Sequence, residues 1–209
     1  MEIKWYGHSC FRLTERGLAS VVTDPYNHKL TGYSALKLKA EVLTISQDKA
    51  DHNYSKAVSG IEWEIRGQGE YEIGGVFITA ISTKGSDQSN LVTIFDFGDV
   101  TVAHLGNIND VPKRSELEAF GTVNIALVPV GGGNSLNAAK AAEVISLIEP
   151  NIVVPMHYKT TKGSQNLDSL NRFHQEMGLP SGENAEESLK VTKSKIPDDS
   201  HVVVLDLTK

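Results

Sequence analysis

The chain has 209 residues, which suits a single domain over residues 1–209 with a hydrophobic core of its own. It carries 20 lysine and arginine residues against 26 aspartate and glutamate residues, a net charge of −6 that argues against nucleic acid as a partner. The only cysteine, Cys10, excludes an intramolecular disulfide bond, and no apolar run is long enough to cross a membrane. Because the first residues also do not resemble a signal peptide, we expect a cytoplasmic protein.

The first half of the chain consists mainly of strand signals. Short apolar or alternating runs are separated by glycine-containing turns, a pattern typical of β-hairpins and buried strands. The predicted strands are residues 3–5, 10–13, 19–23, 41–46, 61–65, 71–81 with a break at Gly74 and Gly75, 91–95 and 100–103.

Helical signals concentrate in the second half. A helix is predicted over residues 112–120, capped by Asp110 and ended by Gly121. Residues 136–148 and 167–177 each place apolar side chains on one helical face. Further strands are predicted at residues 123–130, 152–154 and 201–207. Strands first, followed by alternating strands and helices, favour an α+β sandwich over a doubly wound sheet.

Four of the seven histidines stand where functional sites are usually built. His8 follows a predicted strand and a glycine, and His52 comes shortly after a buried strand. His104 ends a strand, and His157 follows another. A single histidine of this kind is more often a buried structural residue, but four at strand ends favour a shared site at one edge of a sheet.

Six short motifs occur in order along nearly the whole chain. They are GHSCF (residues 7–11), TDPY (23–26), GEYE (69–72), HLGN (104–107), PVGGG (129–133) and PMHYK (155–159). Together they resemble the metallo-β-lactamase-fold superfamily, most of all its small branch of predicted zinc-dependent hydrolases related to ascorbate-phosphate lactonases. The resemblance implies a four-layer αββα sandwich, with the site at one edge between the two sheets.

The resemblance further implies a metal-binding loop of the pattern H-x-H-x-D-H, but residues 47–52 read Q-D-K-A-D-H. Gln47 and Lys49 replace both histidines of a first zinc site, and Asn107 replaces an aspartate that would bridge two metals. Glutamine is a weak ligand, a protonated lysine repels cations, and asparagine brings no charge. We therefore expect a degraded metal centre without binuclear zinc chemistry.

Three residues still match ligands of the second zinc, namely Asp51, His52 and His157. They predict at most one weakly bound divalent ion, zinc, manganese or iron, or no cofactor at all. The candidate catalytic residues are Asp51, His52 and Lys49. The residues expected to line the same cleft are His8, Gln47, His104, Asn107 and Tyr158.

Lys49 occupies the position of a metal ligand, two residues before Asp51. We expect its ammonium group to point into the cleft and to pair with Asp51, replacing the missing metal as an internal cation. The alternative is a solvated loop lysine. A cleft lysine and the glycine turn at residues 131–133 would favour a small anionic ligand over a neutral one.

Three functional hypotheses remain open. The first is a metal-free binding module or pseudoenzyme that uses the cleft. The second is a mononuclear metal-dependent hydrolase acting on an ester, lactone or phosphodiester through Asp51, His52 and His157. The third is a metal-free hydrolase with Lys49 or His104 as the base. Metal content discriminates between the first two, and activity in the presence of a chelator identifies the third.

Overall fold

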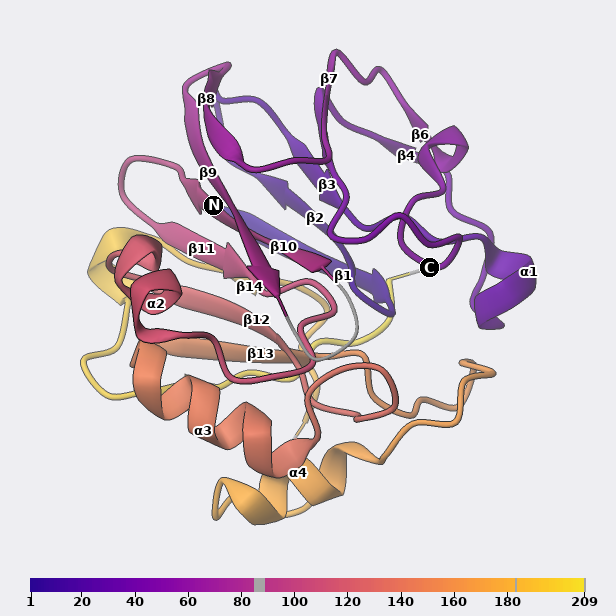
Figure 1. Ribbon diagram of the computed structural model, residues 1–209, viewed down its shortest axis with the longest axis vertical. Coiled ribbons are helices and arrows are strands. Elements are labelled where there is room, and N and C mark those ends of the chain that lie inside the picture. The colour runs from indigo at the N-terminus through magenta and orange to yellow at the C-terminus, as the bar shows by residue number, and fades with distance from the viewer. Residues whose placement is uncertain (85–88, 183, 209) are drawn as a thin grey trace.

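A computed structural model describes residues 1–84, 89–182 and 184–208, and two β-sheets face each other in it (Figure 1). The first sheet has the strand order β14 (Leu189–Lys190), β1 (Glu2–Gly7), β2 (Cys10–Thr14), β3 (Val21–Thr23), β5 (Val42–Thr44), β7 (Trp63–Ile65). The second sheet has the order β15 (His201–Val202), β13 (Ile152–Met156), β12 (Ile125–Pro129), β11 (Thr101–His104), β10 (Ser89–Asp96), β9 (Val76–Lys84), β8 (Gly69–Ile73).

Side-chain alternation in the first sheet builds two apolar layers. Val21 and Val42 point into the main core between the sheets, whereas their neighbours Val22 and Leu43 belong to a separate cluster on the opposite face. Because both faces are covered, β3 and β5 are buried at every position. This explains why their sequences read as continuous apolar runs rather than as alternating ones.

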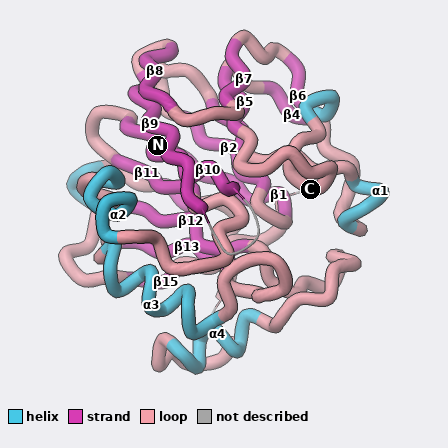
Figure 2. The backbone as a smooth tube through the Cα atoms, viewed as in Figure 1, coloured by secondary structure: helices cyan, strands magenta, loops and turns pink. Residues whose placement is uncertain are grey.

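Helices cover the outer face of the second sheet (Figures 1 and 2). They are α2 (Arg114–Phe120), α3 (Ala138–Ile148) and α4 (Leu170–Glu176). The outer side of the first sheet is covered by a thinner layer, with the single-turn helix α1 (His28–Thr31), a 3-10 turn (Ser55–Ala57) and the pair β4 (Leu38–Lys39) and β6 (Val58–Ser59). The expected αββα sandwich is confirmed, with unequal outer layers.

All three predicted helices begin later than expected, α3 at Ala138 after its N-cap Asn137. Helix α2 begins at Arg114 because the Glu116 carboxylate accepts a hydrogen bond from the backbone N–H of Lys113, at 2.7 Å. Asp110, the predicted cap, pairs with Lys140 instead. Helix α4 begins at Leu170, later than predicted, because the preceding residues belong to a loop that is pinned elsewhere.

The last predicted strand, residues 201–207, is also shorter than expected. Only β15 pairs with β13, over two residues. The chain then crosses to the first sheet, where the N–H of Thr208 donates to the carbonyl of Trp5 at 2.8 Å. The apolar pattern of this segment therefore reflects burial between elements rather than one continuous ladder.

The sheet topology brings several strand ends to one edge. Strands β3 and β5 are parallel neighbours in the first sheet, and β11, β12 and β13 are parallel neighbours in the second. Within each set, the carboxyl ends therefore lie side by side. Asp24, His104 and His157 stand at or directly after such ends. His8 lies in the turn between β1 and β2. None of the described helices has the length and apolar character needed to cross a membrane.

Gly131 marks a point where two backbone segments touch, and it generates a stability prediction. A Cβ atom there would lie 2.2 Å from the carbonyl oxygen of His157. We expect Gly131→Ala to lower the free energy of unfolding by about 3 kcal/mol, because the backbone must move. The control is Gly67→Ala, whose Cβ would meet nothing within 4 Å and should cost less than about 0.5 kcal/mol. Urea denaturation measures both, and equal stability of the two variants would contradict the close approach.

Candidate metal centre

His8, Asp51 and His52 form the candidate metal-binding group among the residues that the structure describes. Each offers one ligand atom, and these atoms lie within 4.8 Å of one another. The two histidines are completely buried, and their ring centroids are 4.5 Å apart. Asp51 is partly exposed, with one carboxylate oxygen 3.7 Å from His8 Nε2. Two imidazoles and a carboxylate are the donor types that zinc and related divalent ions prefer.

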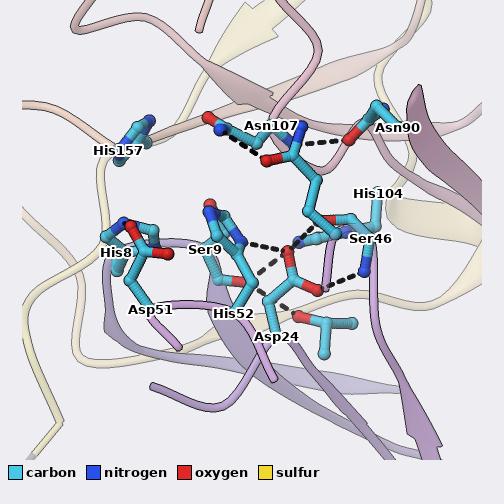
Figure 3. A network of polar contacts seen from close by, with 12 residues as sticks. His8, Ser9, Asp24, Ser46, Asp51, His52, Asn90, His104, Asn107 and His157 are labelled. Atoms are coloured by element: carbon cyan, nitrogen blue, oxygen red, sulfur yellow. Dashed lines mark hydrogen bonds and ion pairs between the residues drawn. The ribbon is translucent and has the colours of Figure 1, made fainter. Parts of the chain in front are cut away.

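His52 is oriented by a buried carboxylate. Its Nδ1 lies 2.8 Å from Oδ2 of Asp24 (Figure 3). Because an ionised carboxylate only accepts hydrogen bonds, Nδ1 carries the proton and Nε2 presents its lone pair. That Nε2 atom is buried and has no hydrogen-bond partner in the protein. A histidine fixed in this way by a carboxylate is the usual arrangement behind a metal ligand.

Asp24 is itself held by the neighbouring strand end. Its carboxylate accepts from the backbone N–H of Ser46 at 2.7 Å and from the Ser46 hydroxyl. Burial alone would raise the pKa of Asp24, but His52, His104 and Ser46 lower it below its usual value. The carboxylate is therefore ionised at neutral pH and acts as a fixed acceptor for His52.

His157 borders the same space and has a similarly defined tautomer. Its Nδ1 lies 3.0 Å from the hydroxyl oxygen of Ser135, and that hydroxyl donates to the carbonyl of Gly132 at 2.9 Å. Ser135 must therefore accept from His157 Nδ1–H, which leaves the lone pair on Nε2. The His157 ring lies 4.3 Å from that of His8 between centroids. His157 is thus a neighbour of the group, while His8 completes it.

The backbone of the site is strained. Non-glycine residues with positive φ in the described chain are His8 (53°), Asp24 (40°), His157 (53°) and Glu149 (52°), which ends a helix. Three of these four, His8, Asp24 and His157, lie at the candidate site. Such conformations cost free energy and persist where surrounding contacts impose them, which is common at functional sites. The carbonyl of His8 accepts from both the N–H of His157 and the indole N–H of Trp5, and these two hydrogen bonds fix its turn.

Burial keeps His8, His104 and His157 neutral. Desolvation, together with the neighbouring histidines, lowers the pKa of His8 well below its usual range and that of His157 to about 3. The pKa of His104 is lowered as well, mainly by burial. A neutral imidazole is the form that binds a metal, so no proton has to be removed from these side chains near pH 7.

Gln47 and Asn107 lie together, as the sequence suggests for two positions of one lost metal site. Asn107 Nδ2 donates to Gln47 Oε1 at 3.1 Å. The backbone N–H of Asn107 donates to Oδ1 of Asn90, which is also buried. Asn107 Oδ1 is buried without a partner. A pair of neutral amides thus occupies this side of the site.

Two predicted lining residues have other roles. His104 is buried, and its Nε2 donates to the carbonyl of Ser9 at 2.9 Å, so this nitrogen is protonated and engaged. Tyr158 packs against Trp5, with ring centroids 5.2 Å apart, and lines a separate surface cavity with Lys4 and Lys159. Burial raises the pKa of its hydroxyl. Tyr158 belongs to the motif PMHYK because it follows His157, which is why it was expected to line the cleft. Its side chain packs beside β1 instead.

The predicted pair between Lys49 and Asp51 is wrong. The Asp51 carboxylate contacts His8 and the amide of Gln165 instead, and no ion pair joins it to Lys49 in the described chain. The carbonyl of Lys49 accepts from the N–H groups of His52 and of the next residue, so the loop forms a helical turn. Residues two apart on a helical turn point to different sides, so this turn does not favour a pair between Lys49 and Asp51.

The glycine turn at residues 131–133 serves packing in place of the anion cradle considered from the sequence. The N–H of Gly131 donates to the carbonyl of His157, and that of Gly132 donates to the carbonyl of Leu136. Two of the three N–H groups of this turn are therefore engaged within the protein.

Several residues of the site were missed by sequence reasoning. Asp24 stood in a quoted motif but was not linked to His52, and His8 was given a lining role only. A charged residue directly after a buried strand was the available signal for Asp24. Ser46, Ser135 and Gln165 carried no signal, because serine and glutamine are common in loops.

Comparison with known proteins places the chain in a family. The model of the beta-lactamase superfamily domain matches residues 2–157. A UPF0173 protein of Pyrococcus abyssi is 30% identical over 187 residues, covering 78% of this chain and 86% of the relative. A protein of Pyrococcus horikoshii named as a UPF0173 metal-dependent hydrolase is 27% identical over 198 residues, covering 77% and 85%.

Solved structures agree with this assignment. A crystal structure from Thermotoga maritima, of the metallo-beta-lactamase superfamily, has a TM-score of 0.81 and 31% identity, and the match covers 98% of each chain. An isothiocyanate hydrolase from Delia radicum gut bacteria has a TM-score of 0.67 at 12% identity, covering 92% of this chain and all of that one, a likeness of fold alone.

The buried pair of Asp24 and His52 generates a prediction. Replacing Asp24 by Asn should weaken zinc binding about 10- to 100-fold, because His52 loses the acceptor that fixes its tautomer. It should also lower the free energy of unfolding by about 2 kcal/mol through lost charge-assisted hydrogen bonds. The control is Asp99→Asn, an exposed acid paired only with Lys193 at 3.6 Å. Chelator competition and urea denaturation report the two effects, and a zinc affinity equal to that of the parent would contradict the assigned role.

Proposed function

The chain belongs to the beta-lactamase superfamily, and from this premise we propose that it is a mononuclear metal-dependent hydrolase. Its metal ion would be held by His8, Asp51 and His52, with His157 as the neighbouring fourth donor. The ligand set predicted from sequence, Asp51, His52 and His157, is retained in this proposal and extended by His8.

The observation that carries the proposal is a set of unpartnered nitrogen atoms. Both ring nitrogens of His8 and the Nε2 of His52 are buried and lack hydrogen-bond partners. A buried polar atom left without a partner costs free energy, commonly about 1–3 kcal/mol each. These atoms adjoin the carboxylate of Asp51 within 4.8 Å. A divalent cation satisfies one nitrogen of each histidine together with the carboxylate, so the residues present fit a metal.

The chain's own residues define what the site can do. A bound divalent ion supplies Lewis-acid polarisation of a substrate oxygen and lowers the pKa of a water molecule. Asp24 keeps the proton of His52 on Nδ1, and Ser135 does the same for His157, so their Nε2 lone pairs stay directed at the site. Burial of the histidines excludes bulk water from one side, while partly exposed Asp51 borders the open side.

A single metal follows from the amide pair of Gln47 and Asn107. Two divalent ions about 3.5–4 Å apart repel each other strongly unless a carboxylate lies between them. A neutral amide supplies no such charge, and the hydrogen bond between the two amides occupies the oxygen of Gln47. The binuclear centre is thus replaced by a one-ion centre. With two carboxylates, Asp24 and Asp51, against one divalent cation, this centre is close to neutral.

The rival functions have less support. A metal-free binding module or pseudoenzyme required Lys49 as the resident cation, and Asp51 is paired elsewhere. A metal-free hydrolase with His104 as base is disfavoured because His104 is buried and its ring is held by the hydrogen bond from Nε2 to the carbonyl of Ser9. The remaining substrate classes are small esters, lactones and phosphodiesters. They are bonds that metal-assisted hydrolysis cleaves, and the near-neutral centre accepts uncharged members as readily as anionic ones.

Metal content tests this proposal. Protein purified without chelator, or reconstituted from the apo form, should hold about one equivalent of zinc, manganese or iron. His52→Ala should remove the metal and the hydrolysis of a panel of esters, lactones and phosphodiesters. The exposed His201, replaced by Ala, serves as control and should keep both. A parent protein that takes up no metal, or that hydrolyses equally well in chelator, would refute the proposal.

Restoring the ancestral ligands tests the role of the amide pair. The triple variant Gln47→His, Lys49→His, Asn107→Asp should bind a second equivalent of zinc, because it regains two imidazoles and a bridging carboxylate. The Asn107→Asp single variant is the matched control and should stay near one equivalent. Stoichiometry is read by elemental analysis after dialysis. A triple variant that still holds one ion would show that more than these side chains separates the centre from a binuclear one.

A further inference from the structure

A loop from the second half of the chain lies against the first half beside the metal centre. It comprises residues 159–169, here called the strap, between β13 and α4. Its ends meet where the N–H of Lys159 donates to the carbonyl of Asp168 at 2.9 Å. Figure 1 shows the strap reaching from β13 toward α1 before it returns to α4.

The strap is pinned to α1 by several hydrogen bonds. The N–H of Ser164 donates to the carbonyl of Thr31 at 2.9 Å, and its hydroxyl donates to that of Leu30. The Thr160 hydroxyl donates to the hydroxyl of Tyr33 at 3.2 Å. The position of the strap is thus determined by its contacts with α1 and with Tyr33.

Gly32 allows this docking. It has φ +77°, and a Cβ there would lie 2.8 Å from the carbonyl oxygen of Lys162 and 2.9 Å from the nitrogen of Ser164. Any side chain at this position would push the strap away from α1. The close approach of backbone to backbone is therefore built into the sequence.

The docked strap delivers one side chain to the centre. Gln165 Nε2 donates to Oδ2 of Asp51 at 3.2 Å. One amide from a distant loop therefore hydrogen-bonds a candidate metal ligand, and it is the side-chain donor to the Asp51 carboxylate within the described part of the chain.

We propose that Gln165 is a positioning residue of the metal centre: carried by the strap, it fixes the Asp51 carboxylate through Oδ2, the oxygen that lies 3.7 Å from His8 Nε2. The inference rests on the proposed function. Asp51 lies on a short, partly exposed turn, where a carboxylate would otherwise rotate freely. A neutral amide orients it without adding a positive charge that would repel the metal, as the ammonium group of a lysine would.

The decisive variant is Gln165→Leu, which keeps the bulk of the side chain and removes its hydrogen bonds. We expect its zinc affinity, measured by competition with a chromophoric chelator, to fall about 10-fold or more. The visible spectrum of the cobalt-substituted protein should change as well, because the geometry around the ion changes. Gln175→Leu, at an exposed position in α4, is the control and should match the parent in both readouts.

Gly32→Ala tests the strap without altering any residue at the centre. It should weaken zinc binding in the same direction as Gln165→Leu, because the displaced strap withdraws the amide. If Gln165→Leu binds zinc as tightly as the parent and with the same cobalt spectrum, the inference is overturned while the proposed function stands. A parent that binds no zinc would overturn both together.

Discussion

A carboxylate buried between two strand ends is the constraint on which the metal centre depends. Asp24 leaves β3 in a left-handed backbone conformation, accepts two hydrogen bonds from Ser46 after β5, and holds His52 through Nδ1. It thereby joins two parallel strands and the loop that carries the candidate ligands. A buried charge of this kind is tolerated because every partner is a donor, and removing it would leave those donors unsatisfied.

The side of the candidate centre formed by Gln47 and Asn107 differs in charge from the side held by Asp24. Where a second cation would require negative charge, Gln47 and Asn107 form a neutral hydrogen-bonded pair supported by Asn90. The backbone around this pair still follows the family fold. The proposed one-ion centre is compatible with this arrangement, because Asp24 supports His52 and not the amide pair.

The sequence predicted the fold well because its signals were local. Apolar runs, glycine turns and helical faces are properties of neighbouring residues, and the structure places strands and helices in most of the predicted segments. Of the candidate site, the sequence pointed to Asp51 and His52 because their loop resembles the metal-binding motif of the family. It failed for Lys49 because the direction of a side chain depends on whether the loop forms a helical turn. It also missed Gln165, since a contact 114 residues away from Asp51 is set by how the strap docks.

The most direct measurement is the anomalous diffraction of crystals grown from zinc-loaded protein, collected on both sides of the zinc absorption edge. We expect one anomalous peak, bounded by His8, Asp51 and His52, with Asp24 still bonded to His52 and no peak beside the amide pair of Gln47 and Asn107. Two peaks separated by about 3.5–4 Å, the spacing of binuclear sites, would contradict a one-metal centre. A single peak away from His8 and His52 would contradict the assignment of the ligands.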